Sequence, residues 1–172
     1  MERYDGKTRK DDVKKWLLIG IPAAIVVIGF FVGMNLIKKA IAPDYTIVTM
    51  MNGTLNDTAK TMVEEAAAAA VGDKNENGKV KIGFKEVTPA AYGGYGDAAA
   101  TLFAGDYVFF LITDPTPWTS DLLAVKTNLS DAKFWQAMDT NQPIYGCILN
   151  TDEDSVAEAQ RIIELLQEQD TP

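Results

Sequence analysis

Three side chains spaced two residues apart, Asp73, Asn75 and Asn77, are followed by Gly78, the pattern that opens a calcium-binding loop. Their oxygens would act as ligands at loop positions 1, 3 and 5, and the glycine would allow the sharp turn at position 6. Position 12, where such loops carry a bidentate acid, is Phe84. Because Asp, Asn and Gly also form turns without any ion, we expect a turn here, with calcium as the only candidate cofactor.

Three loop-like segments carry polar and aromatic side chains that could hold a small polar ligand. "MMNGT" (50–54) leads into a predicted helix, whose free N–H groups suit an anion or a polar head group. "YGGYG" (92–96) offers glycines for close backbone approach and tyrosine rings for stacking, and "TDPTPW" (113–118) follows a predicted strand. The alternative is that these residues have structural roles only. Asn52-Gly53 would then be a turn, Thr54 a helix cap, the glycines a flexible loop and Trp118 a cover for the core. The predicted ligand-binding residues are Asn52, Thr54, Tyr92, Tyr95, Asp114 and Trp118.

The composition argues against catalysis. The chain has no histidine, which removes the commonest general base, and it has no nucleophile-elbow or phosphate-loop motif. Its only cysteine, Cys147, lies in an apolar strand-like run and is expected to be a buried thiol rather than a nucleophile. We therefore predict that the protein is not an enzyme.

Residues 16–37 form an uncharged run of 22 residues, "WLLIGIPAAIVVIGFFVGMNLI". A helix of this length spans roughly 33 Å, enough to cross the hydrocarbon core of a bilayer. A buried core helix and a cleaved signal peptide are the alternatives, but the apolar region of a signal peptide has only about 7–15 residues. We expect an uncleaved transmembrane helix over 16–37.

Flanking charges predict how this helix is oriented. Six Lys and Arg residues precede it in the tail 1–15, whereas only two follow it, in the linker 38–44. By the positive-inside rule the N-terminus is cytoplasmic and the domain 45–172 is extracytoplasmic, at the cell membrane. Beyond residue 42 the chain has eight basic and twenty acidic residues, a net charge of −12. This negative charge argues against nucleic acid as a partner.

The outer segment alternates strand-like and helix-like stretches. Thr54 with Asp57 three residues later resembles a capping box and marks the start of the first helix. The order βαβαβ…βα predicts an α/β fold with a mostly parallel sheet covered by helices on both faces. The expected strands are 45–50, 79–87, 107–113 and 143–150, and the expected helices are 55–71, 96–106, 131–138 and 152–169.

Two stretches carry a family resemblance that covers roughly residues 44–169. "KVKIGFKEV" followed by "AAATLFAGDYVFFLIT" resembles the first lobe of type II periplasmic solute-binding proteins, where a helix ending in a small-residue-Gly-Asp turn leads into an apolar strand. The late stretch "QPIYGCILNTDEDSVAEAQRIIELLQ" resembles the strand and helix that return to that lobe. The resemblance implies a single lobe of the family, without the second lobe that closes over a solute.

These observations leave two functions open. The first is a single-pass bacterial membrane protein whose solute-binding-like lobe recognises a small polar ligand or a partner at the loops named above. The second is a non-catalytic interaction subunit of an envelope complex, which binds no small molecule. In open α/β sheets ligands bind beyond the carboxyl ends of the strands, and that rule places the predicted site.

Overall fold

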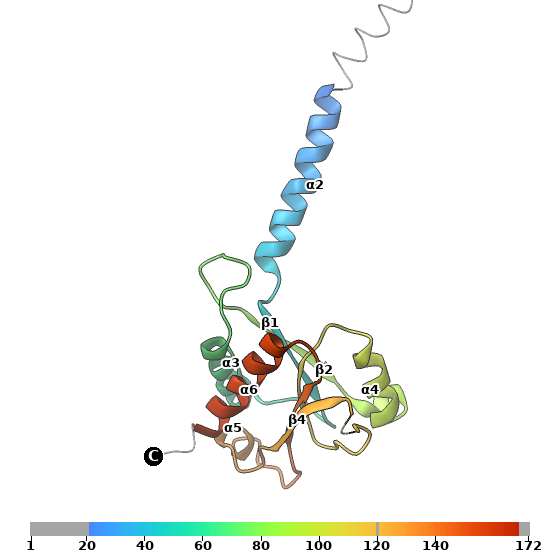
Figure 1. Cartoon of the computed structure of the whole chain (residues 1–172), viewed down its shortest axis with the longest axis vertical. Helices are drawn as coiled ribbons and strands as arrows, with labels where there is room; N and C mark the ends of the chain where they lie inside the picture. Colours follow the sequence, from blue (N-terminus) through green and yellow to red (C-terminus); the bar gives the residue numbers. More distant parts are fainter. Residues whose placement is uncertain (1–20, 120, 169–172) are drawn as a thin grey trace, which may run out of the picture. The chain divides into compact units, whose positions relative to one another are not determined.

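A computed structural model describes residues 21–119 and 121–168 (Figure 1). The chain divides into two compact units, 1–42 and 43–172. The predicted cytoplasmic tail, 1–15, and the first five residues of the predicted transmembrane helix, 16–20, lie outside the described residues.

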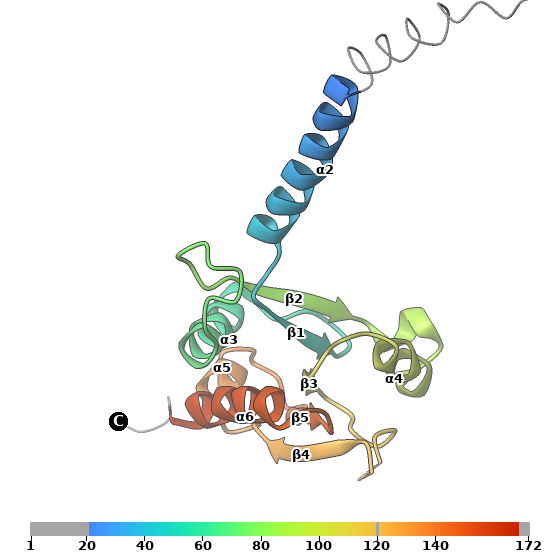
Figure 2. The ribbon, with the colours of Figure 1, turned by 45° about the horizontal axis from the view of Figure 1, so that its top comes forward.

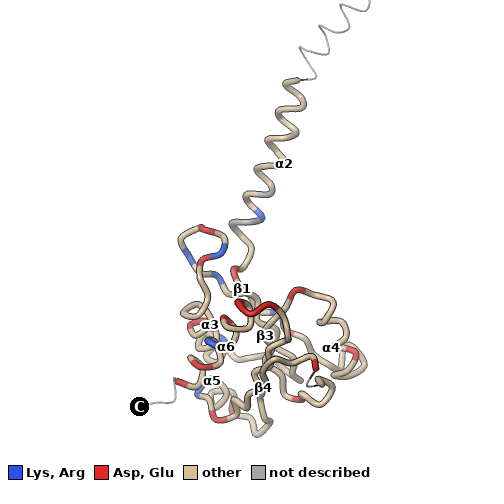
Figure 3. Tube along the Cα trace, in the orientation of Figure 1, with Lys and Arg blue, Asp and Glu red and all other residues tan. Residues whose placement is uncertain are grey.

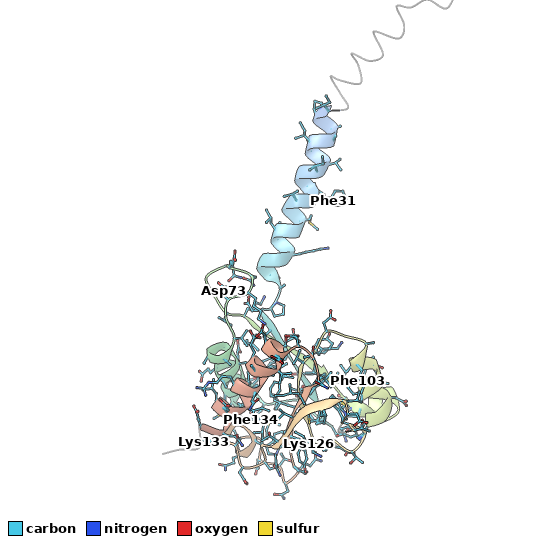
Figure 4. All side chains as sticks on the ribbon, viewed as in Figure 1. Phe31, Asp73, Phe103, Lys126, Lys133 and Phe134 are labelled. Carbon is cyan, nitrogen blue, oxygen red and sulfur yellow. The ribbon has the colours of Figure 1, made fainter. Side chains whose placement is uncertain are left out.

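Helix α2 (Ile21–Ile41) is the described element of the first unit. Among the described helices it is the one long and apolar enough to cross a membrane, over Ile21–Lys38. Side chains such as Phe31, which is 63% exposed, project outward from the helix (Figure 4). A helix that is apolar on all sides is stable only when protein or lipid covers it. The helix also continues through Lys38 to Ile41, into the stretch predicted as a linker.

The second unit is an α/β domain with one five-stranded sheet of order β2-β1-β3-β5-β4 (Figure 2). The strands are β1 (Tyr45–Met50), β2 (Ile82–Val87), β3 (Phe109–Ile112), β4 (Leu123–Asn128) and β5 (Tyr145–Leu149). The helical segments are α3 (Asp57–Ala70), η2 (Pro89–Tyr92), α4 (Tyr95–Phe103), α5 (Lys133–Gln136) and α6 (Glu153–Glu168).

The predicted parallel arrangement holds for the neighbouring strands β1, β2 and β3 but not for the whole sheet, which is mixed. Strand β1 is parallel to β2 and β3, but β5 is antiparallel to both β3 and β4. Strand β4 is absent from the predicted strands, because its six residues, LAVKTN, neither alternate between apolar and polar types nor form a continuous apolar run. Strand β5 lies between β3 and β4 and runs in the opposite direction to both.

Helices cover both faces of the sheet, as predicted. The larger core cluster packs α3, α5 and α6 against one face, and its members include Ile47, Phe109 and Ile148. The smaller cluster packs α4 against the other face, with Val48 and Phe110 among its members. Alternate residues of β1 thus enter opposite clusters, which is the two-residue period expected of a strand buried on both faces.

The first helix of the domain begins differently from the prediction. Its N-cap is Asn56, whose side-chain Oδ1 accepts a hydrogen bond of 2.8 Å from the N–H of Ala59. Thr54 is exposed and lies two residues before this cap, so the expected capping box at Thr54 is wrong. Asparagine and threonine are both good N-caps, and sequence alone could not choose between them.

Candidate functional site

Strands β1, β2 and β3 are parallel neighbours, so their carboxyl ends lie at the same end of the sheet. The predicted ligand-binding residues were expected beyond these ends. The N–H of Met51 donates to the carbonyl of Val87 (3.2 Å), and the N–H of Thr113 donates to the carbonyl of Met50 (3.3 Å). These two bonds join the ends of β1, β2 and β3. The loops that carry the six predicted ligand-binding residues therefore start from a common edge.

The side chain of Tyr95, in the first turn of α4, reaches the end of β3. Its hydroxyl shares a hydrogen bond of 2.5 Å with the hydroxyl of Thr113, a residue that is 9% exposed. The bond ties the start of α4 to the end of β3. Tyr92, by contrast, lies at the end of η2 and is 42% exposed.

Asn52 and Thr54 lie exposed in the loop between β1 and α3. Gly53 between them has a φ of 133°, a backbone conformation that favours glycine. Within the described part of the chain, neither the Asn52 nor the Thr54 side chain makes a hydrogen bond. Both side chains are exposed to solvent.

Asp114 and Trp118 are held by their own surroundings. The Asp114 carboxylate accepts a hydrogen bond of 3.0 Å from the N–H of Thr116. Trp118 is 4% exposed. The centroid of its ring lies 4.7 Å from the ring centroid of Phe110 and 4.9 Å from that of Phe103. The tryptophan is thus part of the smaller core cluster. The six residues lie in loops at the same end of the parallel strands. Among them, Tyr95 and Asp114 form side-chain hydrogen bonds there.

The calcium-like segment is a turn between α3 and β2 (Figure 4). The Asp73 carboxylate accepts hydrogen bonds from the N–H groups of Asn77 (3.2 Å) and Gly78 (2.6 Å). The Asn77 side chain accepts one from the N–H of Lys79 (3.0 Å). Among the described residues, no group of three or more His, Cys, Asp or Glu side chains is placed to hold a metal ion. The oxygens of this segment are used in closing the turn, and calcium stays an untested prediction.

Cys147 lies in β5 and is fully buried. Burial raises the pKa of its thiol to about 12, and the charge of Lys126 offsets this only in part. A thiol with so high a pKa carries almost no thiolate at neutral pH, so it is a poor nucleophile.

A feature that the sequence did not predict lies at the other end of the parallel strands, at the start of β1 and before β3. A cavity of about 260 Å³ opens between the residues preceding β3 and the start of β1, with Asp44–Thr46 on one wall and Asp106–Val108 on the other. We call this opening the β1/β3 gap. A second cavity of about 390 Å³ shares four lining residues with the first and extends toward the start of α6; the shared residues are Asp106, Tyr107, Val108 and Ser155.

A sequence signal for the gap exists. Asp-Tyr occurs twice, at 44–45 before β1 and at 106–107 before β3. Strands β1 and β3 are neighbours in the sheet, and both Asp-Tyr pairs line the cavity that opens before them. The repeated Asp-Tyr pair indicates a shared cavity only once β1 and β3 are known to be neighbours in the sheet.

Compared with models of known protein families, with curated proteins and with solved structures, the chain gives no match. Its function must therefore be argued from the geometry described above.

Proposed function

We propose that this chain is a single-pass membrane protein that displays a non-catalytic, solute-binding-like recognition domain outside the cytoplasm. The observation that carries the proposal is helix α2, whose apolar side chains are exposed along its length. A bilayer supplies the apolar surroundings that such a helix needs. The excess of basic residues before the span supports a cytoplasmic N-terminus.

The character of the domain supports recognition rather than catalysis. The chain lacks histidine, and its single thiol is buried. The sheet edge with the six predicted residues and the β1/β3 gap both offer polar groups to a small ligand.

Cysteine labelling in intact spheroplasts tests the topology. The native Cys147 is buried, so it gives little background with a membrane-impermeant maleimide. We expect Thr116→Cys, at an exposed position of the domain, to be labelled in intact spheroplasts. We expect Thr8→Cys, in the N-terminal tail, to be labelled only after permeabilisation. The reverse pattern, or labelling of both variants only after permeabilisation, would overturn the proposed topology.

A second candidate is an interaction subunit that binds no small molecule. The observation in its favour is that the Tyr95 hydroxyl and the Asp114 carboxylate already have partners within the protein, and that Trp118 is buried. A thermal-shift series on the full chain in detergent micelles, with sugars, amino acids, amines and oxyanions, separates the two. A rise in melting temperature with any of them favours a ligand-binding domain, and no shift favours the interaction subunit.

A further inference from the structure

Two Asn-Gly pairs occur in the chain, Asn52-Gly53 and Asn77-Gly78. Asparagine loses its side-chain amide most readily when glycine follows it, because glycine has no Cβ to hinder attack of its nitrogen on the preceding side chain. The two pairs lie in different loops of the domain, one after β1 and one between α3 and β2. Their surroundings differ in ways that bear directly on this reaction.

The first pair lies in an exposed loop between two buried residues. Asn52, Gly53 and Thr54 are exposed, whereas Met51 before them is 3% exposed and Leu55 after them is 5% exposed. Both buried residues belong to the larger core cluster. The three loop residues can therefore change conformation while the core on either side of them stays packed.

The reacting groups of the first pair are weakly held. Within the described part of the chain, no hydrogen bond fixes the rotamer of the Asn52 side chain. The attacking atom is the backbone nitrogen of Gly53, whose N–H donates to the neutral carbonyl of Met51 at 3.1 Å. A Cβ at Gly53 would meet nothing within 4 Å, so the backbone there has room to move. The nitrogen and the side-chain carbon can thus approach to the separation of about 3–3.5 Å from which attack occurs.

The same groups of the second pair are held in place. The N–H of Gly78 donates to the Asp73 carboxylate at 2.6 Å, and the Asn77 side-chain oxygen accepts from the N–H of Lys79 at 3.0 Å. A hydrogen bond to a charged acceptor is stronger than one to a neutral carbonyl. The Gly78 nitrogen is therefore more firmly held than the Gly53 nitrogen.

Charge acts in the same direction. Figure 3 shows acidic and basic residues along the turn between α3 and β2, whereas the loop 52–54 has no charged residue. Attack requires the backbone nitrogen to give up its proton. A carboxylate beside the N–H disfavours this loss, because two negative charges would then repel each other. Asp73 therefore protects Asn77, while the partner of the Gly53 N–H is neutral.

We propose that Asn52 is a site of spontaneous deamidation in the folded protein, and that the turn around Asp73 protects Asn77. The Gly53 nitrogen loses its proton and bonds to the side-chain carbonyl carbon of Asn52. The bond from that carbon to the amide nitrogen breaks, and this nitrogen takes up a proton and leaves as ammonia. Water then adds to either carbonyl of the five-membered succinimide and opens it to aspartate or isoaspartate. In sum, one amide and one water become one carboxylate and one ammonium ion, with no oxidant or reductant.

The product changes the chemistry at the carboxyl end of β1. Asn52 is one of the six predicted ligand-binding residues, and its amide both donates and accepts hydrogen bonds. A carboxylate only accepts them, and it adds a negative charge to the loop. Isoaspartate also inserts the side-chain methylene into the main chain. The reaction needs only the loop and water, so it is independent of the proposed topology and of any ligand.

Mass spectrometry of the full chain, aged in detergent micelles at pH 8, tests the proposal. Tryptic peptides 40–60 and 75–79 carry the two asparagines, and fragment ions locate the modified residue. In the folded chain we expect Asn77 to react about tenfold more slowly than Asn52, the factor given by one hydrogen bond to a charged group. In urea the two rates should become similar, because unfolding removes the bonds that distinguish the pairs. Equal rates in the folded chain, or no reaction at Asn52, would overturn the proposal, while the labelling result for topology would stand unaffected.

Variants of the turn test the stated cause. Asp73→Ala removes the acceptor of the Gly78 N–H, so it should speed the reaction of Asn77 about tenfold and leave that of Asn52 unchanged. Asp131→Ala, at an exposed position outside both loops, is the matched control and should change neither rate. Asn52→Gln should stop the reaction at this position, since a glutamine must close a six-membered ring, which forms far more slowly. An Asn77 rate that is the same in Asp73→Ala and Asp131→Ala would refute protection by the turn.

Discussion

The side-chain amide of Asn56 donates a hydrogen bond of 2.7 Å to the carbonyl oxygen of Ala137, which joins the start of α3 to the end of α5. The oxygen of the same side chain caps α3, so both the nitrogen and the oxygen of the Asn56 amide form hydrogen bonds. We expect Asn56→Ala to lower the free energy of unfolding by about 1–2 kcal/mol. Thr54→Ala, which removes the capping residue suggested by sequence, should change it by less than about 0.5 kcal/mol. Urea unfolding followed by circular dichroism measures both, and equal losses would contradict the assignment of the cap.

Gly146 in β5 is packed so closely that an added Cβ would force neighbouring side chains to shift. A Cβ at this position would lie 2.9 Å from Cδ1 of Leu129 and 3.2 Å from Cδ1 of Ile163. We expect Gly146→Ala to destabilise the domain by about 1–3 kcal/mol through overpacking. Gly72→Ala is the matched control, because an added Cβ there meets nothing within 4 Å. Thermal unfolding of the two variants should differ clearly, and a neutral Gly146→Ala would contradict the packing of β5 against α6.

The two tyrosines predicted for the ligand site have different structural roles. Tyr95→Phe leaves the hydroxyl of Thr113 without its partner, and we expect it to lower stability by about 1 kcal/mol. Tyr92 is 42% exposed, so Tyr92→Phe should be neutral within about 0.5 kcal/mol. Chemical unfolding of both variants provides the comparison. Similar stabilities for the two would argue against the hydrogen bond that ties α4 to β3.

Acid should weaken the contact between Asp44 and the turn that follows α3. Hydrogen bonds from the N–H groups of Lys81, first, and Asn75 hold the pKa of the Asp44 carboxyl below its ordinary value of 3.8. Its contribution to stability is therefore complete above about pH 4 and is lost as the pH falls through the folded-state pKa. Asp44→Asn should flatten the stability profile between about pH 4 and pH 2. Superimposable acid-unfolding curves for the two proteins would refute this role.

Burial of Cys147 should make its thiol inert in the native state. With a pKa of about 12, the thiol should react with a disulfide reagent such as dithionitrobenzoate only after the domain unfolds. The measurement is the release of the coloured thiolate with and without denaturant at pH 8. Rapid reaction without denaturant would show that the thiol is accessible.

The sequence by itself determined the local structure and the long apolar segment. The strand over Tyr45–Met50 was predicted with its observed bounds, because a short β-branched apolar run followed by a turn has few other conformations open to it. The predicted helices have counterparts within a few residues, since helix formers and acidic first turns act within the helix itself.

Only the tertiary structure decided which strands are neighbours and in which direction they run. The place of β5 between β3 and β4 depends on the edge strand β4, which has weak local signals of its own. The burial of Trp118 likewise depends on Phe103 and Phe110, which belong to other elements. The placing of Asp44-Tyr45 and Asp106-Tyr107 around one cavity depends on β1 and β3 being neighbours in the sheet. Pairing and packing are set by contacts between residues far apart in the chain, and the local periodicity of a sequence carries no record of them.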